Sequence, residues 1–398
     1  MDVAAFCRKS RVLVVAGKGG VGKTTITAAL ARMAAQAGLS VLVVELEGKP
    51  GVAAAFGRSG GLRYQPSVLT GDGGWGSGGD DGAGPGHDGR SDRRRAGGGR
   101  ESRDGRESRD GREAQDGSRG EAAPGTVRAR RITPDDALLE YLADHGMKRI
   151  SKRLVSSGAL DVVATAIPGI RDILVLGKVK SLERERSADL ILVDAPATGH
   201  AMTFLSSAQG LLDAARSGPV RTQAADVVEL LADPERCQVT LVTLAEEMPV
   251  NEVVEAAYAL EDRIGVSLGP VIVNSCLPAD PRLDRDPLET AAEVGVTLNA
   301  DQATSLGAAA VFRRRRYELQ EEQRARLATE LPLPQLQAPF LFSATIGPDE
   351  VDRLAAELAE AVRRLPDEDG ATRSPRPKRA DVLGAQAGTV VPDGDAAP

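Results

Sequence analysis

The sequence has few aromatic residues, few cysteines and no long apolar run. Aromatic residues make up 3% of the 398 residues, so the core must be built from Ala, Val, Leu and Ile. The three cysteines, Cys7, Cys237 and Cys276, lie far apart without a CxxC motif. This spacing excludes a disulfide framework and a sequence-local zinc or iron–sulfur site. No apolar run approaches the ~20 residues of a membrane span, so we expect no stable membrane insertion.

Positive charge is also in deficit. The formal net charge is −7, whereas a nucleic-acid binder needs a basic surface to neutralise phosphates. We therefore expect no nucleic-acid partner. The first twenty residues place a short apolar run before glycines and a lysine, which is not the layout of a signal peptide. We expect a cytoplasmic protein.

Short apolar runs alternate with helical patterns along most of the chain. Strands are expected at 11–16, 40–45, 127–132, 189–193, 238–243, 266–274 and 336–342, and helices at 24–37, from Thr133-Pro134 onward, at 300–329 and at 349–364. Strand–helix–strand repeats imply a parallel sheet covered by helices. The fold class predicted is therefore α/β, with a doubly wound parallel sheet of the P-loop NTPase type and a helical insertion at 133–186.

We predict that residues 1–365 form a single domain. Residues 70–125 are rich in Gly, Arg and Asp and contain the repeat RESRDG twice. Such a segment buries too little apolar surface to offset its ordering entropy, so it is expected to be a disordered insertion. The tail 366–398 is rich in Pro, Gly and charge and is also expected to be disordered. The cluster Arg313–Arg316 is followed by Glu-rich turns, which suggests a solvated helix face.

The strongest motif runs from Gly17 to Thr24, GKGGVGKT. It satisfies the phosphate-binding pattern G-x-x-x-x-G-K-[ST] between a strand and a helix. The backbone N–H groups that would converge on phosphate belong to Gly17, Gly19, Gly20, Val21 and Gly22. Lys23 would reach the β- and γ-phosphates, the Thr24 hydroxyl would ligate Mg²⁺, and Thr25 would contact an earlier phosphate. The expected ligands are ATP and Mg²⁺.

A second lysine, Lys18, lies inside this loop. A single-chain phosphate cradle does not need it, and an unpaired cation there would repel Lys23. The loop resembles the deviant Walker A motif of the ATPases that include ArsA, MinD, ParA and the nitrogenase iron protein. In that group the equivalent lysine reaches the nucleotide of a partner subunit, so the resemblance implies a catalytic role for Lys18 across a dimer interface.

Asp194 follows an apolar strand, as a Walker B carboxylate does; the residue alone could equally cap a helix. The string DAPATGH at 194–200 looks like the switch II segment of the ArsA family, which also includes the eukaryotic ATPase that targets tail-anchored proteins. Further segments are similar to that family, namely PGIRD at 168–172, VTLAEEMP at 242–249 and the pair Val273-Asn274. The segments EGKPG and VTLAEEMP most resemble the corresponding segments of actinobacterial ArsA-like ATPases.

The resemblance implies roles for several residues. Asp194 would hold Mg²⁺ together with Thr24, Gly199 would sense the γ-phosphate, and Asn274 would hydrogen-bond adenine. The switch I position that carries a catalytic Asp in the family is occupied by Glu47. Because its side chain is one methylene longer and orienting a water requires sub-ångström placement, hydrolysis is expected to be slow or to need correction by a partner.

Together these features predict a Mg-dependent ATPase of the ArsA family, with ATP bound at a dimer interface and hydrolysed to drive conformational cycling. The partner is a second copy or a paralogous ArsA-like chain, and a protein client is possible. Two alternatives remain open: a low-turnover regulatory subunit of a heterodimer, and a positioning ATPase of the MinD/ParA type. The three separated cysteines do not form the thiolate group that arsenite requires, and the five methionines do not suggest a methionine-rich client groove.

Overall fold

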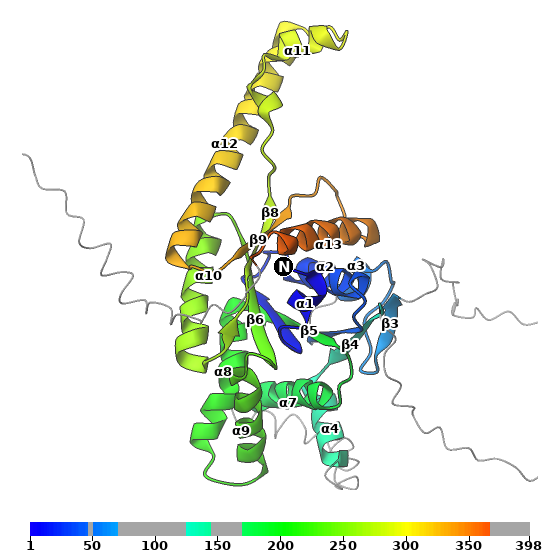
Figure 1. Cartoon of the computed structure of the whole chain (residues 1–398), viewed down its shortest axis with the longest axis vertical. Coiled ribbons are helices and arrows are strands. Elements are labelled where there is room, and N and C mark those ends of the chain that lie inside the picture. Colours follow the sequence, from blue (N-terminus) through cyan, green and yellow to red (C-terminus); the bar gives the residue numbers. More distant parts are fainter. Residues whose placement is uncertain (47–50, 71–124, 145–168, 367–398) are drawn as a thin grey trace, which may run out of the picture.

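The computed structural model describes residues 1–46, 51–70, 125–144 and 169–366. These residues form a nine-stranded sheet in the order β3-β4-β2-β5-β1-β6-β8-β9, with β7 paired to β6 (Figure 1). All pairings are parallel except that of β3 with β4. The strands are β1 Val12–Gly17, β2 Val41–Leu46, β3 Ser67–Thr70, β4 Val127–Ile132, β5 Leu190–Ala197, β6 Cys237–Leu244, β7 Ser267–Leu268, β8 Val271–Cys276 and β9 Gln335–Pro339.

Helices cover both faces of the sheet. They are α1 Val3–Cys7, α2 Lys23–Gln36, α3 Val52–Ala55, α4 Pro134–Asp144, α7 Ile170–Arg184, α8 Thr198–Ala214, α9 Pro219–Ala232, α10 Glu247–Ala259, α11 Pro287–Glu293, α12 Ala300–Glu330 and α13 Pro348–Arg363. Side chains alternate along β1: Val12 and Val14 join the core under α7, α8 and α10, whereas Val15 joins the core under α2 and α13. Figure 1 shows these two layers on opposite sides of the sheet.

The parallel strands end at one edge of the sheet. Gly17 lies level with Ala197 of β5 and with Val242 of β6, and Leu244 of β6 lies level with Asn274 of β8. The loops that follow β1, β5, β6 and β8 therefore meet at this carboxyl edge, where ligands bind in open parallel sheets.

The predicted fold class is confirmed, and most predicted strands lie within a few residues of the observed ones. The prediction of one strand at 266–274 is wrong, because Gly269 and Pro270 separate β7 from β8; proline cannot donate a ladder hydrogen bond. Strand β5 also continues past Asp194 to Ala197. The structure adds an antiparallel edge strand, β3, which the sequence analysis did not anticipate.

The predicted disordered segments lie almost wholly outside the described residues. At the limits of the 70–125 segment, Thr70 ends β3 and the Gly125 N–H donates to the Leu39 carbonyl. Within the predicted helical insertion 133–186, the structure describes α4 and α7. The Thr133 hydroxyl accepts from the Asp136 N–H at 3.1 Å, so Thr133 starts α4 as predicted.

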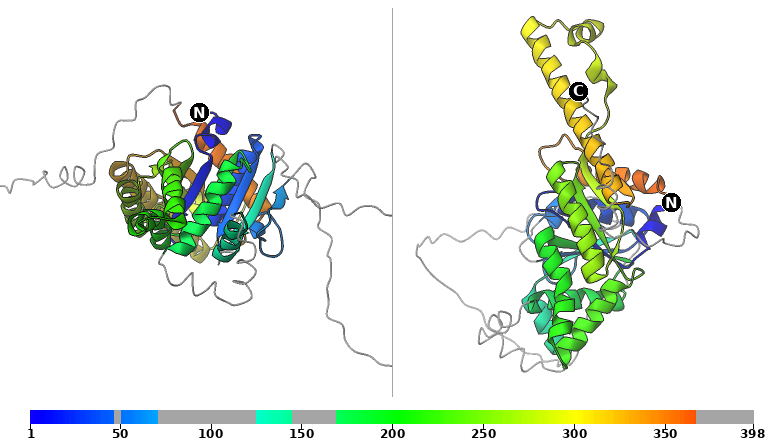
Figure 2. Two further views of the ribbon diagram at one scale, coloured as in Figure 1. Left: turned by 90° about the horizontal axis from the view of Figure 1, so that it is seen from below. Right: turned by 90° about the vertical axis from the view of Figure 1, so that its left-hand side faces the viewer.

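One part of the chain projects from the body of the molecule. The segment after β8 and the first part of α12 form a projecting arm, residues 277–319, with α11 at its far end (Figures 1 and 2). Within the described ranges, no helix is both long enough and apolar enough to cross a lipid bilayer.

Candidate nucleotide-binding site

The loop from Gly17 to Thr24 joins the end of β1 to the start of α2 at the carboxyl edge. Two of its glycines cannot be replaced without collision. A Cβ on Gly17 would lie 2.2 Å from the Val242 carbonyl oxygen, and one on Gly22 would lie 2.4 Å from Nδ2 of Asn274. Gly22 also has φ +88°, a left-handed conformation that favours glycine. The loop is therefore a tight backbone cradle of the kind that binds phosphate.

The cradle opens onto the amino end of α2. Gly22 is the N-cap of this 14-residue helix and provides no side-chain cap. A helix N-terminus without a side-chain cap presents backbone N–H groups to this side of the loop, and the helix dipole favours an anion there. Thr25 lies in this first turn, and its contact with an earlier phosphate stays a prediction. Val21, in the loop itself, is 2% exposed.

Lys23 is the buried cation of the cradle. The residue is only 6% exposed, and its Nζ donates to the Lys18 carbonyl at 2.7 Å. Burying an ammonium is costly unless a partner compensates it. An anionic phosphate in the cradle would add to this compensation, so the position of Lys23 fits the predicted role.

The two residues predicted to hold Mg²⁺ lie together. The Thr24 hydroxyl donates to Oδ2 of Asp194 at 2.7 Å, although Asp194 is 170 residues further along the chain. Asp194 is fully buried in β5, level with Val15 of β1. A hydroxyl and a carboxylate are hard oxygen donors of the type that Mg²⁺ prefers. The donor chemistry therefore fits this ion.

Charged side chains continue along the same level of the sheet. Arg131 on β4 lies level with Glu45 on β2, which lies level with Asp194 on β5. Glu45 is fully buried, and its Oε1 accepts from Nη2 of Arg131 at 2.9 Å. The guanidinium thus compensates one of two neighbouring buried carboxylates.

Asn274, the predicted adenine contact, also reaches the loop. Its Nδ2 donates to the Val21 carbonyl at 2.9 Å, and its Oδ1 accepts from the Ser275 N–H at 2.8 Å. Ser275 has φ +58°, which is uncommon for a residue other than glycine. Both polar groups of the Asn274 amide are therefore engaged within the chain, and base recognition would require at least one of them to change partner.

The segment resembling switch II lies against the same loop. A Cβ on Gly19 would be 3.8 Å from Cβ of Ala197, which ends β5 immediately before α8. Gly199 is exposed in the first turn of α8. The segment around 169–172 is also close: burial raises the pKa of Asp172, and the nearby charges of His200 and Arg171 oppose this rise. Two segments that the resemblance identified separately therefore meet here.

Comparison with known proteins agrees with this geometry. The family described as the CobQ/CobB/MinD/ParA nucleotide binding domain matches residues 12–158. The ATPase BagA of Mycobacterium tuberculosis is 33% identical over 312 residues, which cover 75% of this chain and 74% of BagA. A Mycobacterium bovis ATPase aligns with the same identity and coverage. The chain belongs to the BagA family of ATPases.

As a BagA-family protein, the chain is an ATPase of the CobQ/MinD/ParA P-loop class. A more distant relative from Halobacterium salinarum, named as an arsenical pump-driving ATPase, is 24% identical over 372 residues. The alignment covers 88% of this chain and 44% of that relative, so the chain spans less than half of the latter's length.

Lys18 lies on the outer side of the cradle of this BagA-family ATPase. Its Nζ contacts Oε1 of Glu252 on α10 at 2.5 Å, and the two side chains are 40% and 32% exposed. The lysine is therefore accessible but held by an acid of its own chain. This ion pair is not predictable from the sequence, because Lys18 and Glu252 are 234 positions apart.

Glu47, the predicted switch I acid, lies outside the described residues. Its neighbour Glu45 is described and was missed by the sequence analysis. Besides binding Arg131, Glu45 accepts through Oε2 from the N–H groups of Gly51 and Val52, each at 3.3 Å. Glu45 therefore ties the chain on the far side of Glu47 to β2. The signal was present in the sequence as one acid at the end of the apolar run VLVVEL.

The cysteines occupy separate buried places in α1, β6 and β8. Burial raises the pKa of Cys7 and of Cys237 to about 12, and that of Cys276 to about 11. All three are therefore protonated thiols at neutral pH rather than the thiolates that bind soft ions.

The helical region holds a cavity of about 680 Å³ among α4, α7 and α9. Its wall includes Lys178, which binds Glu140 at 2.7 Å, and Lys180, which binds Asp226. These ion pairs give the cavity a polar wall.

Proposed function

We propose that this chain is an ATPase of the ArsA type, in which Mg·ATP is bound between two subunits and its hydrolysis opens and closes the dimer. The observation that carries the proposal is the hydrogen bond between Thr24 and Asp194 beneath the glycine cradle. Further support comes from the distant relative named as an arsenical pump-driving ATPase.

In this proposal the hydrolytic step is in-line attack of water on the γ-phosphorus, with breakage of its bond to the bridging oxygen. Lys23 neutralises charge on the β- and γ-phosphates. Thr24 and Asp194 hold Mg²⁺, which would stabilise the same charge. The carboxylate of Glu47 orients the water and accepts its proton, and the Gly199 N–H senses the γ-phosphate.

The remaining residues bind and complete the site. The N–H groups of Gly17, Gly19, Gly20, Val21 and Gly22 cradle the phosphates, Thr25 contacts an earlier phosphate, and the Asn274 amide meets adenine. Lys18 releases Glu252 and turns to the nucleotide of the partner subunit. Because a trans lysine is present only in the closed dimer, hydrolysis and dimer closure are coupled.

Complementation between two inactive variants tests this arrangement. Lys18→Ala removes the lysine given to the partner, and Lys23→Ala removes the lysine of the chain's own cradle. Each variant alone should hydrolyse ATP at least ~100-fold more slowly than the natural protein. A mixed dimer has one complete site, formed by Lys23 of one chain and Lys18 of the other. An equimolar mixture should therefore recover up to about a quarter of the natural activity, because half of the dimers are mixed and one of their two sites works.

Phosphate release is measured for each variant, for the mixture and for Arg353→Ala, an exposed control on α13. A mixture as inactive as its components would contradict the trans role of Lys18. If the natural chain is inactive alone and becomes active with a paralogous chain, the partner is that paralogue. Inactivity in both cases would favour a regulatory subunit. We propose that the conformational cycle acts on a client protein bound to the helical region.

A further inference from the structure

The arm extends well beyond the carboxyl edge of the sheet. Its root is fixed by Gln320, whose Oε1 accepts from the Leu277 N–H at 2.8 Å and whose Nε2 donates to the Ser275 carbonyl at 3.1 Å. Gln320 is therefore level with the end of β8. The 20 or so residues of α12 that precede it span about 30 Å, at 1.5 Å per residue. The right-hand view of Figure 2 shows this part of the helix projecting from the body of the molecule.

Only one side of this overhanging helix is covered. A Cβ on Gly307 would be 3.9 Å from Pro287 of α11, and Arg314 binds Asp284 at 2.7 Å. The residues that share this partly buried side are Ala303, Gly307, Ala310, Arg314 and Tyr317. They recur every three or four positions, as one face of a helix does. The rest of the arm therefore packs along this face.

The opposite face of the helix is exposed along its whole overhang. It carries Asp301, Ala308, Phe312, Arg315 and Leu319, at spacings of three, four or seven residues. Phe312 is 69% exposed and Leu319 is 53% exposed, in a chain with only six phenylalanines. An exposed apolar stripe flanked by charge is typical of a protein contact surface.

The charges on this face are arranged to complement a second copy of the same face. Asp301 and Arg315 each lie seven residues from Ala308, on either side. Neither side chain forms an ion pair with another described residue. Within one chain they are about 21 Å apart along the helix axis, so they cannot meet. In two antiparallel copies crossing at Ala308, each Asp301 would face Arg315 of the other copy.

We propose that this exposed face of α12 is a contact site for a second copy of the chain, with the two arms antiparallel about a two-fold axis at Ala308. The small Ala308 side chains let the helices approach closely, and Phe312 and Leu319 are covered by the other arm. One helix face is small compared with a standard interface, so we expect association in the micromolar range. The contact does not require nucleotide.

Charge exchange tests the contact by sedimentation equilibrium without nucleotide. Asp301→Arg and Arg315→Glu each place like charges opposite one another twice in the dimer. Each should weaken self-association at least about tenfold. An equimolar mixture of the two variants should restore it, because every pair across the mixed dimer is then opposite in charge. The double variant should also restore it, while Phe312→Ser should weaken it without altering charge.

Glu357→Arg and Arg353→Glu provide matched controls, since both residues are exposed on α13, and they should associate like the natural chain. The proposal is overturned if the natural chain is monomeric without nucleotide at about 100 μM, well above a micromolar dissociation constant, or if neither the mixture nor the double variant recovers association. Mg·ATP binding, measured on the same variants, should remain that of the natural chain. If the natural chain itself does not bind Mg·ATP, that result would instead contradict the proposed ATPase site.

Discussion

At the scale of single residues, the site depends on carboxylates placed at the ends of buried strands. Asp194 meets Thr24, and Glu45 holds both Arg131 and the backbone that follows Glu47. A buried carboxylate requires such partners, because an unpaired charge in the interior is costly. The contacts that compensate these buried carboxylates therefore also position the loops at the carboxyl edge of the sheet.

Glu252 is expected to restrain Lys18 before the partner subunit arrives. In Glu252→Gln the ion pair is lost and the lysine is freed. Because both side chains are partly exposed, the pair is worth about 1 kcal/mol or less. We therefore expect ATP turnover to rise by up to about fivefold at low protein concentration, where dimer closure limits the rate.

Steady-state phosphate release across a protein titration measures this effect, with Glu255→Gln on the same helix as the control. The rates should converge at high concentration, where closure is no longer limiting. A lower rate in Glu252→Gln at every concentration would contradict a purely restraining role.

Much of the site was predictable residue by residue, because a P-loop has a fixed spacing and a strand-end acid has a fixed place. The sequence predicts that Thr24, Asp194 and Asn274 lie at one edge of the sheet. In the structure Thr24 donates to Asp194, and Asn274 donates to the Val21 carbonyl of the same loop. Glu45 and the Lys18–Glu252 pair were not predictable, because each depends on which strands and helices become neighbours.

At the scale of elements, buried parallel strands were the easiest to predict, because both faces are covered and the sequence becomes a continuous Val, Leu and Ile run. Strand β4 matches its predicted bounds at Val127 and Ile132. Strand β3 was missed because four residues beside a Gly-rich segment carry no periodic signal. The error at 266–274 was avoidable, since Pro270 inside an apparent strand argues against it.

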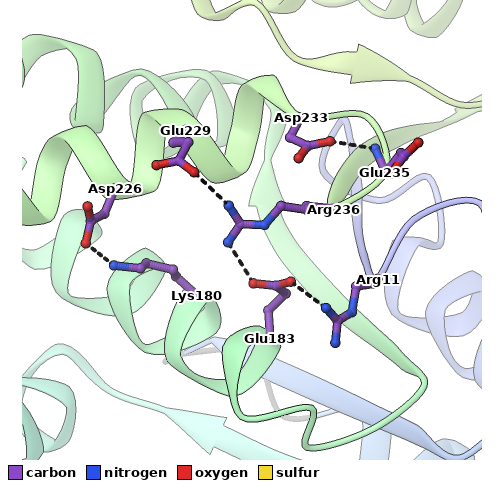
Figure 3. Close-up of polar contacts among 8 residues, drawn as sticks. All are labelled: Arg11, Lys180, Glu183, Asp226, Glu229, Asp233, Glu235 and Arg236. Atoms are coloured by element: carbon purple, nitrogen blue, oxygen red, sulfur yellow. Dashed lines mark hydrogen bonds and ion pairs between the residues drawn. The ribbon is translucent and has the colours of Figure 1, made fainter.

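A group of ion pairs joins elements at the amino edge, opposite the candidate site (Figure 3). Glu183 at the end of α7 is 3% exposed and binds Arg11 at 3.2 Å and Arg236 at 2.8 Å. Arg236 also contacts Glu229 of α9 at 3.4 Å. These pairs connect α7 and α9 to the chain entering β1 and β6.

Glu183→Ala should lower the free energy of unfolding by about 3 kcal/mol, because it leaves two arginines without their buried partner. Urea unfolding measures this change. Glu229→Ala is the control within the same group; its side chain is 74% exposed, so its effect should stay below about 1 kcal/mol. The KM for ATP should not change in either variant, since the pairs lie at the other edge. A Glu183 effect as small as that of Glu229 would contradict the account.

At the scale of the whole molecule, the α/β class followed from alternating apolar runs and helical patterns, but the arm did not. The 300–329 stretch was predicted to be a charged, solvated helix, and α12 has the expected length. Its charge pattern does not reveal that the first part leaves the domain, because an overhanging helix and a surface helix are equally polar. The four arginines 313–316 also separate: Arg314 binds Asp284 and Arg316 binds Glu246.

The whole account depends on a nucleotide in the cradle between β1 and α2, and calorimetric titration of the natural chain with ATP measures this directly. With magnesium we predict one ATP per chain and a dissociation constant in the micromolar range, weakened by chelation of the metal and by Lys23→Ala. The central claim would be contradicted if ATP at millimolar concentrations, with magnesium present, gave no binding heat.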